Sequence, residues 1–122
     1  MEIIIVIIIL GVIAGLALPN ISFSIEKSKS AEGVQILTAL LGGQRAFAID
    51  HNGTYTTDTN QLDVTVPRSD NFNTPILRDG SSGVLAEISS RNNHYELSIN
   101  PAGHIGCTDD SGGSYCSRLG YR

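Results

Sequence analysis

The chain has 122 residues, enough for one small domain, and a formal net charge of −4. Because phosphate binding needs a basic surface and the chain has no Lys/Arg cluster, we expect no nucleic-acid partner. The sequence also lacks a nucleophile elbow, a phosphate-binding glycine loop and metal-ligand spacing. We therefore expect neither an enzyme nor a cofactor.

The first twenty residues, MEIIIVIIILGVIAGLALPN, contain a single charged side chain, that of Glu2. The apolar run has about the ~20 residues that a bilayer requires, and a strand would leave its backbone groups unsatisfied in lipid. We therefore predict a hydrophobic membrane helix at residues 1–24. No small-residue cleavage site follows the run, so a cleavable signal peptide is not expected.

Three residues in this segment affect how the predicted helix bends and packs. Gly11 and Gly15 form a G-x-x-x-G pair, which allows two helices to approach closely in an apolar setting. The alternative is that glycine is simply tolerated in membrane helices. Pro19 removes a backbone donor, so the helix is expected to be kinked or melted near Gly11–Pro19, unless one helix ends there and another begins.

Residues 25–50 have the pattern of an amphipathic helix. Val34, Leu37 and Leu41 fall near one face at helical spacing. If the helix is continuous from the N-terminus, it is on the order of 70 Å long, more than twice the hydrocarbon thickness of a bilayer. This second half should therefore project beyond the membrane and place its apolar face on other residues of the chain.

Residues 51–122 are predicted to form a globular head, which makes the chain α+β. An irregular connection rich in Thr, Asn and Asp occupies residues 51–76. Within residues 83–107, the segments GVLAEIS, HYELSIN and GHIGC have strand character and are separated by turn signals. This spacing predicts a small antiparallel meander packed on the helix.

Three further features of the head suggest chemistry. Cys107 and Cys116 predict a disulfide that closes a loop at residues 107–116 in an oxidising compartment, the alternative being two reduced buried cysteines. Asp109 and Asp110 supply clustered oxygens for calcium, although an ion that takes six or more ligands would need others, and a polar turn is the alternative. Asn52 begins an Asn-Gly-Thr glycosylation sequon on a predicted exposed turn, which could also be an ordinary polar loop.

Glu2, the apolar run, Gly11 and the ALPN stretch with Pro19 together resemble the N-terminus of type IV pilins and pseudopilins. The resemblance implies the pilin fold, in which a long N-terminal helix is followed by an αβ-loop, an antiparallel sheet and a disulfide-bounded C-terminal loop. It also implies that three residues precede Met1 in the mature protein, the first of them N-methylated after leader removal. Glu2 would then meet the positive N-terminal amine of a neighbouring subunit.

The function that the resemblance implies is that of a major pilin. The subunit would wait in the inner membrane as a single-pass protein in contact with lipid, and an assembly platform would add it to an extracellular helical homopolymer. Adhesion, motility or surface attachment would follow from such a filament. Two alternatives remain open, namely a type II secretion pseudopilin or minor pilin, and a monomeric membrane-anchored binding module.

Overall fold

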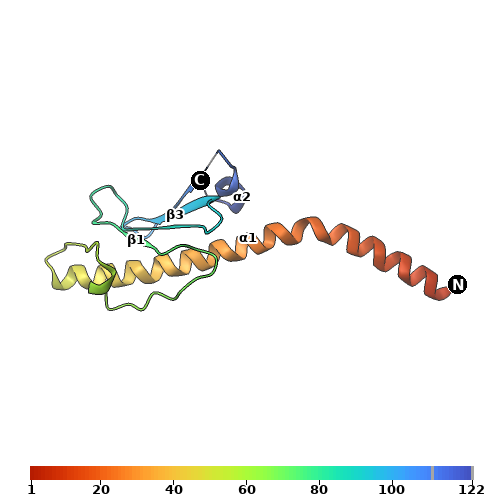
Figure 1. Cartoon of the computed structure of the whole chain (residues 1–122), viewed down its shortest axis with the longest axis horizontal. Helices are drawn as coiled ribbons and strands as arrows, with labels where there is room; N and C mark the ends of the chain where they lie inside the picture. The colour runs from red at the N-terminus through yellow and green to blue at the C-terminus, as the bar shows by residue number, and fades with distance from the viewer. Residues whose placement is uncertain (111, 122) are drawn as a thin grey trace.

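The computed structural model describes residues 1–110 and 112–121, and within its first helix it describes every side chain except those of residues 17–20. That helix, α1, spans Glu2–Asp50 and has 49 residues. Its N-terminal part extends away from the head, and its C-terminal part lies against the sheet (Figure 1). The parts Glu2–Leu16 and Ile21–Asp50 are inclined to each other by 46°. The helix therefore changes direction near the predicted kink, while the side chain of Pro19 lies outside the described residues.

Four antiparallel strands form one sheet in the order β1-β2-β3-β4, which confirms the predicted meander. The strands are β1 (Ile76–Leu77), β2 (Ala86–Ser89), β3 (Tyr95–Ile99) and β4 (Ile105–Asp109). The sheet thus extends beyond the expected range of 83–107 at both ends. β1 has only two residues, too few for a strand pattern in the sequence, and β4 continues past its cysteine because Asp109 still pairs with Tyr95.

The core lies between one face of the sheet and the C-terminal half of α1. Side chains alternate along β2 and β3, so that apolar residues point to the helix and polar residues to the outer face. The fully buried contacts come from Leu37, Leu40, Ile88, Leu97 and Ile99. The amphipathic half of α1 therefore packs on the sheet, as the pattern of its apolar residues predicts.

The αβ-loop, residues 51–75, runs along one side of α1 (Figure 1). It contains a short 3-10 helix, Thr59–Gln61, and buries the side chains of Leu62 and Phe72 in the core. Gln44 of α1 is itself fully buried and bonds the loop backbone at Thr56. The loop is therefore an anchored part of the head.

The C-terminal segment packs at the neck of the molecule, the region where α1 leaves the head. A disulfide joins Cys107 of β4 to Cys116 of the short helix α2 (Tyr115–Leu119), which confirms the predicted pair. Asp109 accepts a hydrogen bond from the Cys116 amide at 2.9 Å, which fixes the first turn of α2. The Arg118 guanidinium lies 5.3 Å from the centre of the Phe23 ring, so α2 also contacts α1.

Candidate functional site

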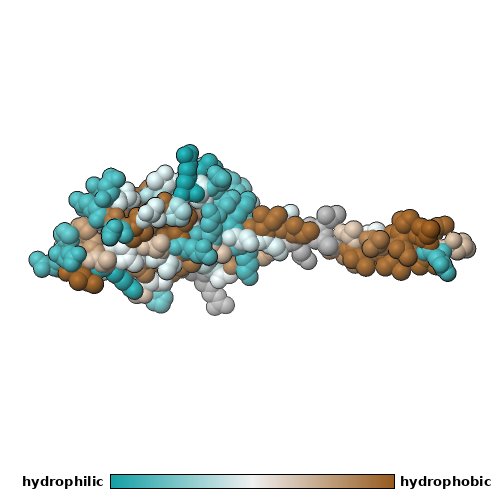
Figure 2. Space-filling view, turned by 90° about the horizontal axis from the view of Figure 1, so that it is seen from below, coloured by the Kyte–Doolittle hydropathy of each residue, from teal (hydrophilic) through white to brown (hydrophobic). Residues whose placement is uncertain are grey.

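The N-terminal part of α1 has no covering layer in the single chain. Each large apolar side chain between residues 3 and 16 is more than half exposed, from 52% for Ile9 to 75% for Ile3. These side chains cover all sides of the helix, and Figure 2 shows the same segment as a hydrophobic rod projecting from a largely hydrophilic head. A helix that is apolar on all sides is normally buried, either in a protein core or in a membrane.

Burial of this segment would be strongly favourable. Each fully buried Val, Leu or Ile side chain contributes about 1.5–3 kcal/mol. A carboxylate such as that of Glu2 costs about 3 kcal/mol at a bilayer centre on insertion scales, so the apolar side chains together outweigh it. Among the described residues, no single unbent helix is both long enough and apolar enough to cross a membrane. The two parts of α1 on either side of its bend, Glu2–Leu16 and Ile21–Asp50, meet both requirements only as a pair, by length and composition alone.

Three of the predicted assembly residues, Glu2, Gly11 and Gly15, lie on this exposed part of α1. Glu2 lies in the first turn of α1, where a carboxylate interacts favourably with the helix dipole, and it forms no ion pair within the described part of the chain. A methyl group added at Gly11 or Gly15 would meet no atom within 4 Å. These two positions, one turn apart, therefore present an open face to any partner. The roles assigned to them and to Pro19 stay predictions.

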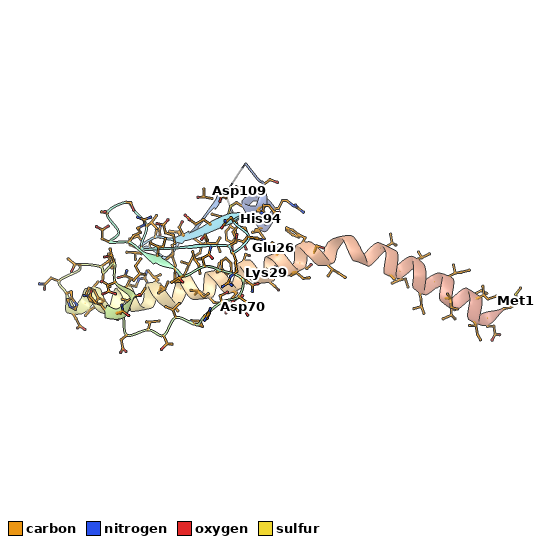
Figure 3. The ribbon with its side chains drawn as sticks, in the orientation of Figure 1. Met1, Glu26, Lys29, Asp70, His94 and Asp109 are labelled. Carbon is orange, nitrogen blue, oxygen red and sulfur yellow. A yellow bond between two sulfur atoms is a disulfide. The ribbon has the colours of Figure 1, made fainter. Side chains whose placement is uncertain are left out.

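The neck contains a charged pair and a buried phenol. Lys29 lies 3.7 Å from the carboxylate of Glu26, and Figure 3 shows both residues on α1 where it enters the head. Tyr95 is 1% exposed, and its hydroxyl has no hydrogen-bond partner in the described part of the chain. Burial first, and then the negative charge of Glu26, raise the pKa of the Tyr95 phenol, so it stays protonated.

The two aspartates considered for calcium differ in what they contact. The Asp109 carboxylate is engaged by the α2 backbone, whereas Asp110 is exposed and its amide donates to the His94 carbonyl at 3.1 Å. Within residues 1–110 and 112–121, no group of three or more His, Cys, Asp or Glu side chains is arranged to hold a metal ion. The position of the Asp109 carboxylate is explained by the hydrogen bond that it accepts from the first turn of α2.

The glycosylation sequon lies on the turn that follows α1. Asn52 is exposed and has a φ of 54°, and the next residue, Gly53, bonds back to the Ala48 carbonyl at 2.7 Å. The Thr54 hydroxyl donates to the His51 carbonyl at 2.6 Å. The amide of Asn52 is therefore accessible, while the sequon hydroxyl is used to hold the turn. Modification of Asn52 stays a prediction.

A groove between α1 and the αβ-loop is not apparent from the sequence. It has a volume of about 420 Å³. Its lining includes two arginines, the accessible apolar residues and the buried core side chains next to them, namely Arg68, Arg91, Val66, Pro67, Pro75, Ile36, Phe72 and Ile88. The loop sequence VPRSDNF mixes apolar residues with an arginine. Only the path of the loop over α1 turns that mixture into a concave surface.

The surfaces available for function are thus the exposed half of α1, the groove and the outer face of the sheet. No protein-family model matches this chain, and no curated protein or solved structure matches it. The function is accordingly argued from the geometry of these surfaces and from the resemblance of the N-terminal residues to pilins.

Proposed function

We propose that this chain is the structural subunit of a type IV pilus-like extracellular filament and that it polymerises through the N-terminal half of α1. The observation that carries the proposal is a single helix, Glu2–Asp50, with an apolar and uncovered first half and a second half buried under a sheet. The arrangement of long helix, αβ-loop, antiparallel sheet and disulfide-closed C-terminal segment is compatible with the pilin fold, which forms part of the proposal.

In this proposal the apolar half of α1 has two successive environments. Lipid of the inner membrane covers it before assembly, and the corresponding helices of neighbouring copies cover it in the filament. The open face at Gly11 and Gly15 allows those helices to approach closely. The head, with its disulfide, then forms the outer surface, where adhesion or motility would be expressed.

The Glu2 carboxylate has a different energetic cost in each of these two environments. In lipid its carboxylate is a cost without compensation, whereas opposite the N-terminal amine of a neighbouring copy the charge is paired. The carboxylate would therefore favour the filament over the membrane and fix the axial register of the packed helices. Glu2→Gln should keep the subunit in the membrane and reduce filament yield, whereas Lys27→Gln, a change at an exposed charge on the same helix, should not.

The experiment that tests the proposal is electron microscopy of material sheared from the surface of the native cells, at a resolution that allows side chains to be traced. Helical fibres that fit this sequence, with Glu2 buried against a neighbouring N-terminus, are expected. If the sheared fraction lacks the chain and all of it remains with the membrane, a surface filament is ruled out.

A second candidate is a protein that stays in the membrane, either a type II secretion pseudopilin or a membrane-anchored binding module. The bent pair within α1 meets the requirements of a span by length and composition only, which is compatible with this class. Crosslinking in native membranes separates the two forms, because a pseudopilin forms short oligomers and a binding module stays monomeric.

A further inference from the structure

The last turn of α1 carries an exposed apolar side chain beside an unpaired carboxylate. Ile49 is 83% exposed, the highest value among the large apolar residues of the head. Asp50 follows it, is also exposed, and forms no ion pair in the described part of the chain.

Neither residue is explained by the fold of a single copy. Asp50 is the last residue of α1, and the last turn of that helix contains no basic residue. A carboxylate at a helix C-terminus is unfavourable, because it faces the negative end of the helix dipole. Ile49 contributes nothing to the core at that exposure. A contact outside the single chain would account for both.

The groove between α1 and the αβ-loop is complementary to Ile49 and Asp50, because its lining is apolar and positively charged. Its accessible apolar lining comes from Val66, Pro67 and Pro75, and none of its described lining residues is Asp or Glu. Arg68 is exposed and has no hydrogen bond or ion pair in the described part of the chain. Arg91 is held in place by a hydrogen bond from its guanidinium to the Ser69 carbonyl at 3.0 Å. An apolar side chain followed by a carboxylate suits such a site.

We infer that Ile49 and Asp50 of one copy dock in the αβ-loop groove of a second copy, with the isoleucine against the accessible apolar lining and the carboxylate between Arg68 and Arg91. The inference rests on the proposed function, because it names a head contact within the proposed filament. Ile36 and Ile49 are separated by about 20 Å along α1. The two copies would therefore be displaced by about that distance along the helix axis, which makes the contact head-to-tail and repeatable.

The charges of the contact can be tested with the full chain by reversal and exchange. Asp50→Arg and Arg68→Asp should each raise the critical concentration for assembly about tenfold, the factor that corresponds to about 1.4 kcal/mol. The double exchange should restore assembly. Both side chains are exposed, and a cation at position 50 suits the helix dipole, so neither change should unfold the head.

The apolar part of the contact has a matched control. Ile49→Ser should weaken assembly, whereas Ile76→Ser should not, because Ile76 is 56% exposed but does not line the groove. In filaments of the Asp50→Cys and Arg68→Cys double variant, oxidation should produce a ladder of covalent oligomers. The Asp50→Cys and Ser81→Cys variant should give none.

The outcomes separate this inference from the proposed function. If filaments form and neither the charge reversals nor Ile49→Ser changes the critical concentration, this contact is overturned and the filament stands. If both single reversals weaken assembly and the exchange fails to restore it, the pairing of positions 50 and 68 is overturned. If the wild-type chain shows no self-association at all, both proposals are overturned.

Discussion

Gln44 and Thr56 exchange two hydrogen bonds across the boundary between α1 and the αβ-loop. The Gln44 side-chain amide donates to the Thr56 carbonyl at 2.6 Å, and the Thr56 amide donates to the Gln44 side-chain oxygen at 3.0 Å. The glutamine is fully buried, so its side chain takes the place that a neighbouring strand would have for the loop backbone. The position of the loop, and with it the shape of the groove, depends on this pair.

Replacement of Gln44 by Ala should therefore lower the free energy of unfolding by roughly 2–4 kcal/mol, because a buried backbone donor and acceptor lose their partners. Urea unfolding of the full chain in a mild detergent, followed by the near-ultraviolet circular dichroism of its tyrosines, would measure the change. Gln35→Ala on the exposed side of α1 is the control. Equal effects of the two substitutions would contradict the role given to the Gln44 pair.

Two glycines of α1 are predicted to respond to the same substitution with opposite signs. A methyl group at Gly33 would lie 2.7 Å from the Phe72 ring, whereas one at Gly42 would meet nothing within 4 Å. Gly33→Ala should therefore destabilise the head by about 1–3 kcal/mol through overpacking. Gly42→Ala should stabilise it by about 0.5–1 kcal/mol through helix propensity. Thermal unfolding of both variants tests this, and a stabilised Gly33→Ala would show that the ring moves aside freely.

The sequence was sufficient to predict the elements that depend on local patterns. The apolar spacing of α1, the alternation along β2 and β3, and the pairing of Cys107 with Cys116 were all visible without a structure. A change of helix direction near Pro19 was predicted too, since proline cannot donate a backbone hydrogen bond.

The features that were not predicted depend on tertiary contacts. β1 is a strand only because Leu77 and its neighbour pair with β2, and two residues carry no periodic signal. Gln44 is a polar residue that helical spacing cannot distinguish from a solvated one, because its partner lies 12 residues further along the chain. The groove likewise requires the loop and the helix together. Local patterns therefore predict the elements, while the surfaces that would contact a partner require the packed structure.

The disulfide should stabilise the neck rather than the sheet. Cys107 and Cys116 are nine positions apart, and closure of a loop of that length stabilises the folded state by about 2.5 kcal/mol in the chain-entropy model. The double variant Cys107→Ser and Cys116→Ser should lose that amount. Hydrogen exchange should increase first in α2, which loses its side-chain cross-link to β4, and more slowly in β2 and β3. Uniformly faster exchange across the sheet would show instead that the bond supports the whole head.

Two carboxylates of the head should affect the pH dependence of stability with opposite signs. The pKa of Glu96, on the outer face of the sheet, is raised above 4.5 by burial first, and then by a hydrogen bond to Glu87 and the negative charge of Glu87. The charge of Asp110 raises this pKa further, whereas the charge of Arg78 lowers it. The Asn71 amide, which donates to Glu32 at 2.7 Å, and then Ser69 lower the pKa of Glu32.

The stabilising contributions follow from these directions. A raised carboxyl pKa gives stability that is fully present below pH 4.5 and is lost as the pH rises through the folded-state pKa. A lowered one gives stability that is present above pH 4.5 and is lost as the pH falls through the folded-state pKa. At pH 7, Glu96→Gln should therefore raise the free energy of unfolding, because it removes a repelled charge, and Glu32→Gln should lower it. Both differences from the wild type should shrink as the pH falls toward 3. Urea titrations at several pH values provide the measurement. A Glu96→Gln variant that is less stable than the wild type at pH 7 would mean that the Glu87–Glu96 contact does not form on the folded sheet.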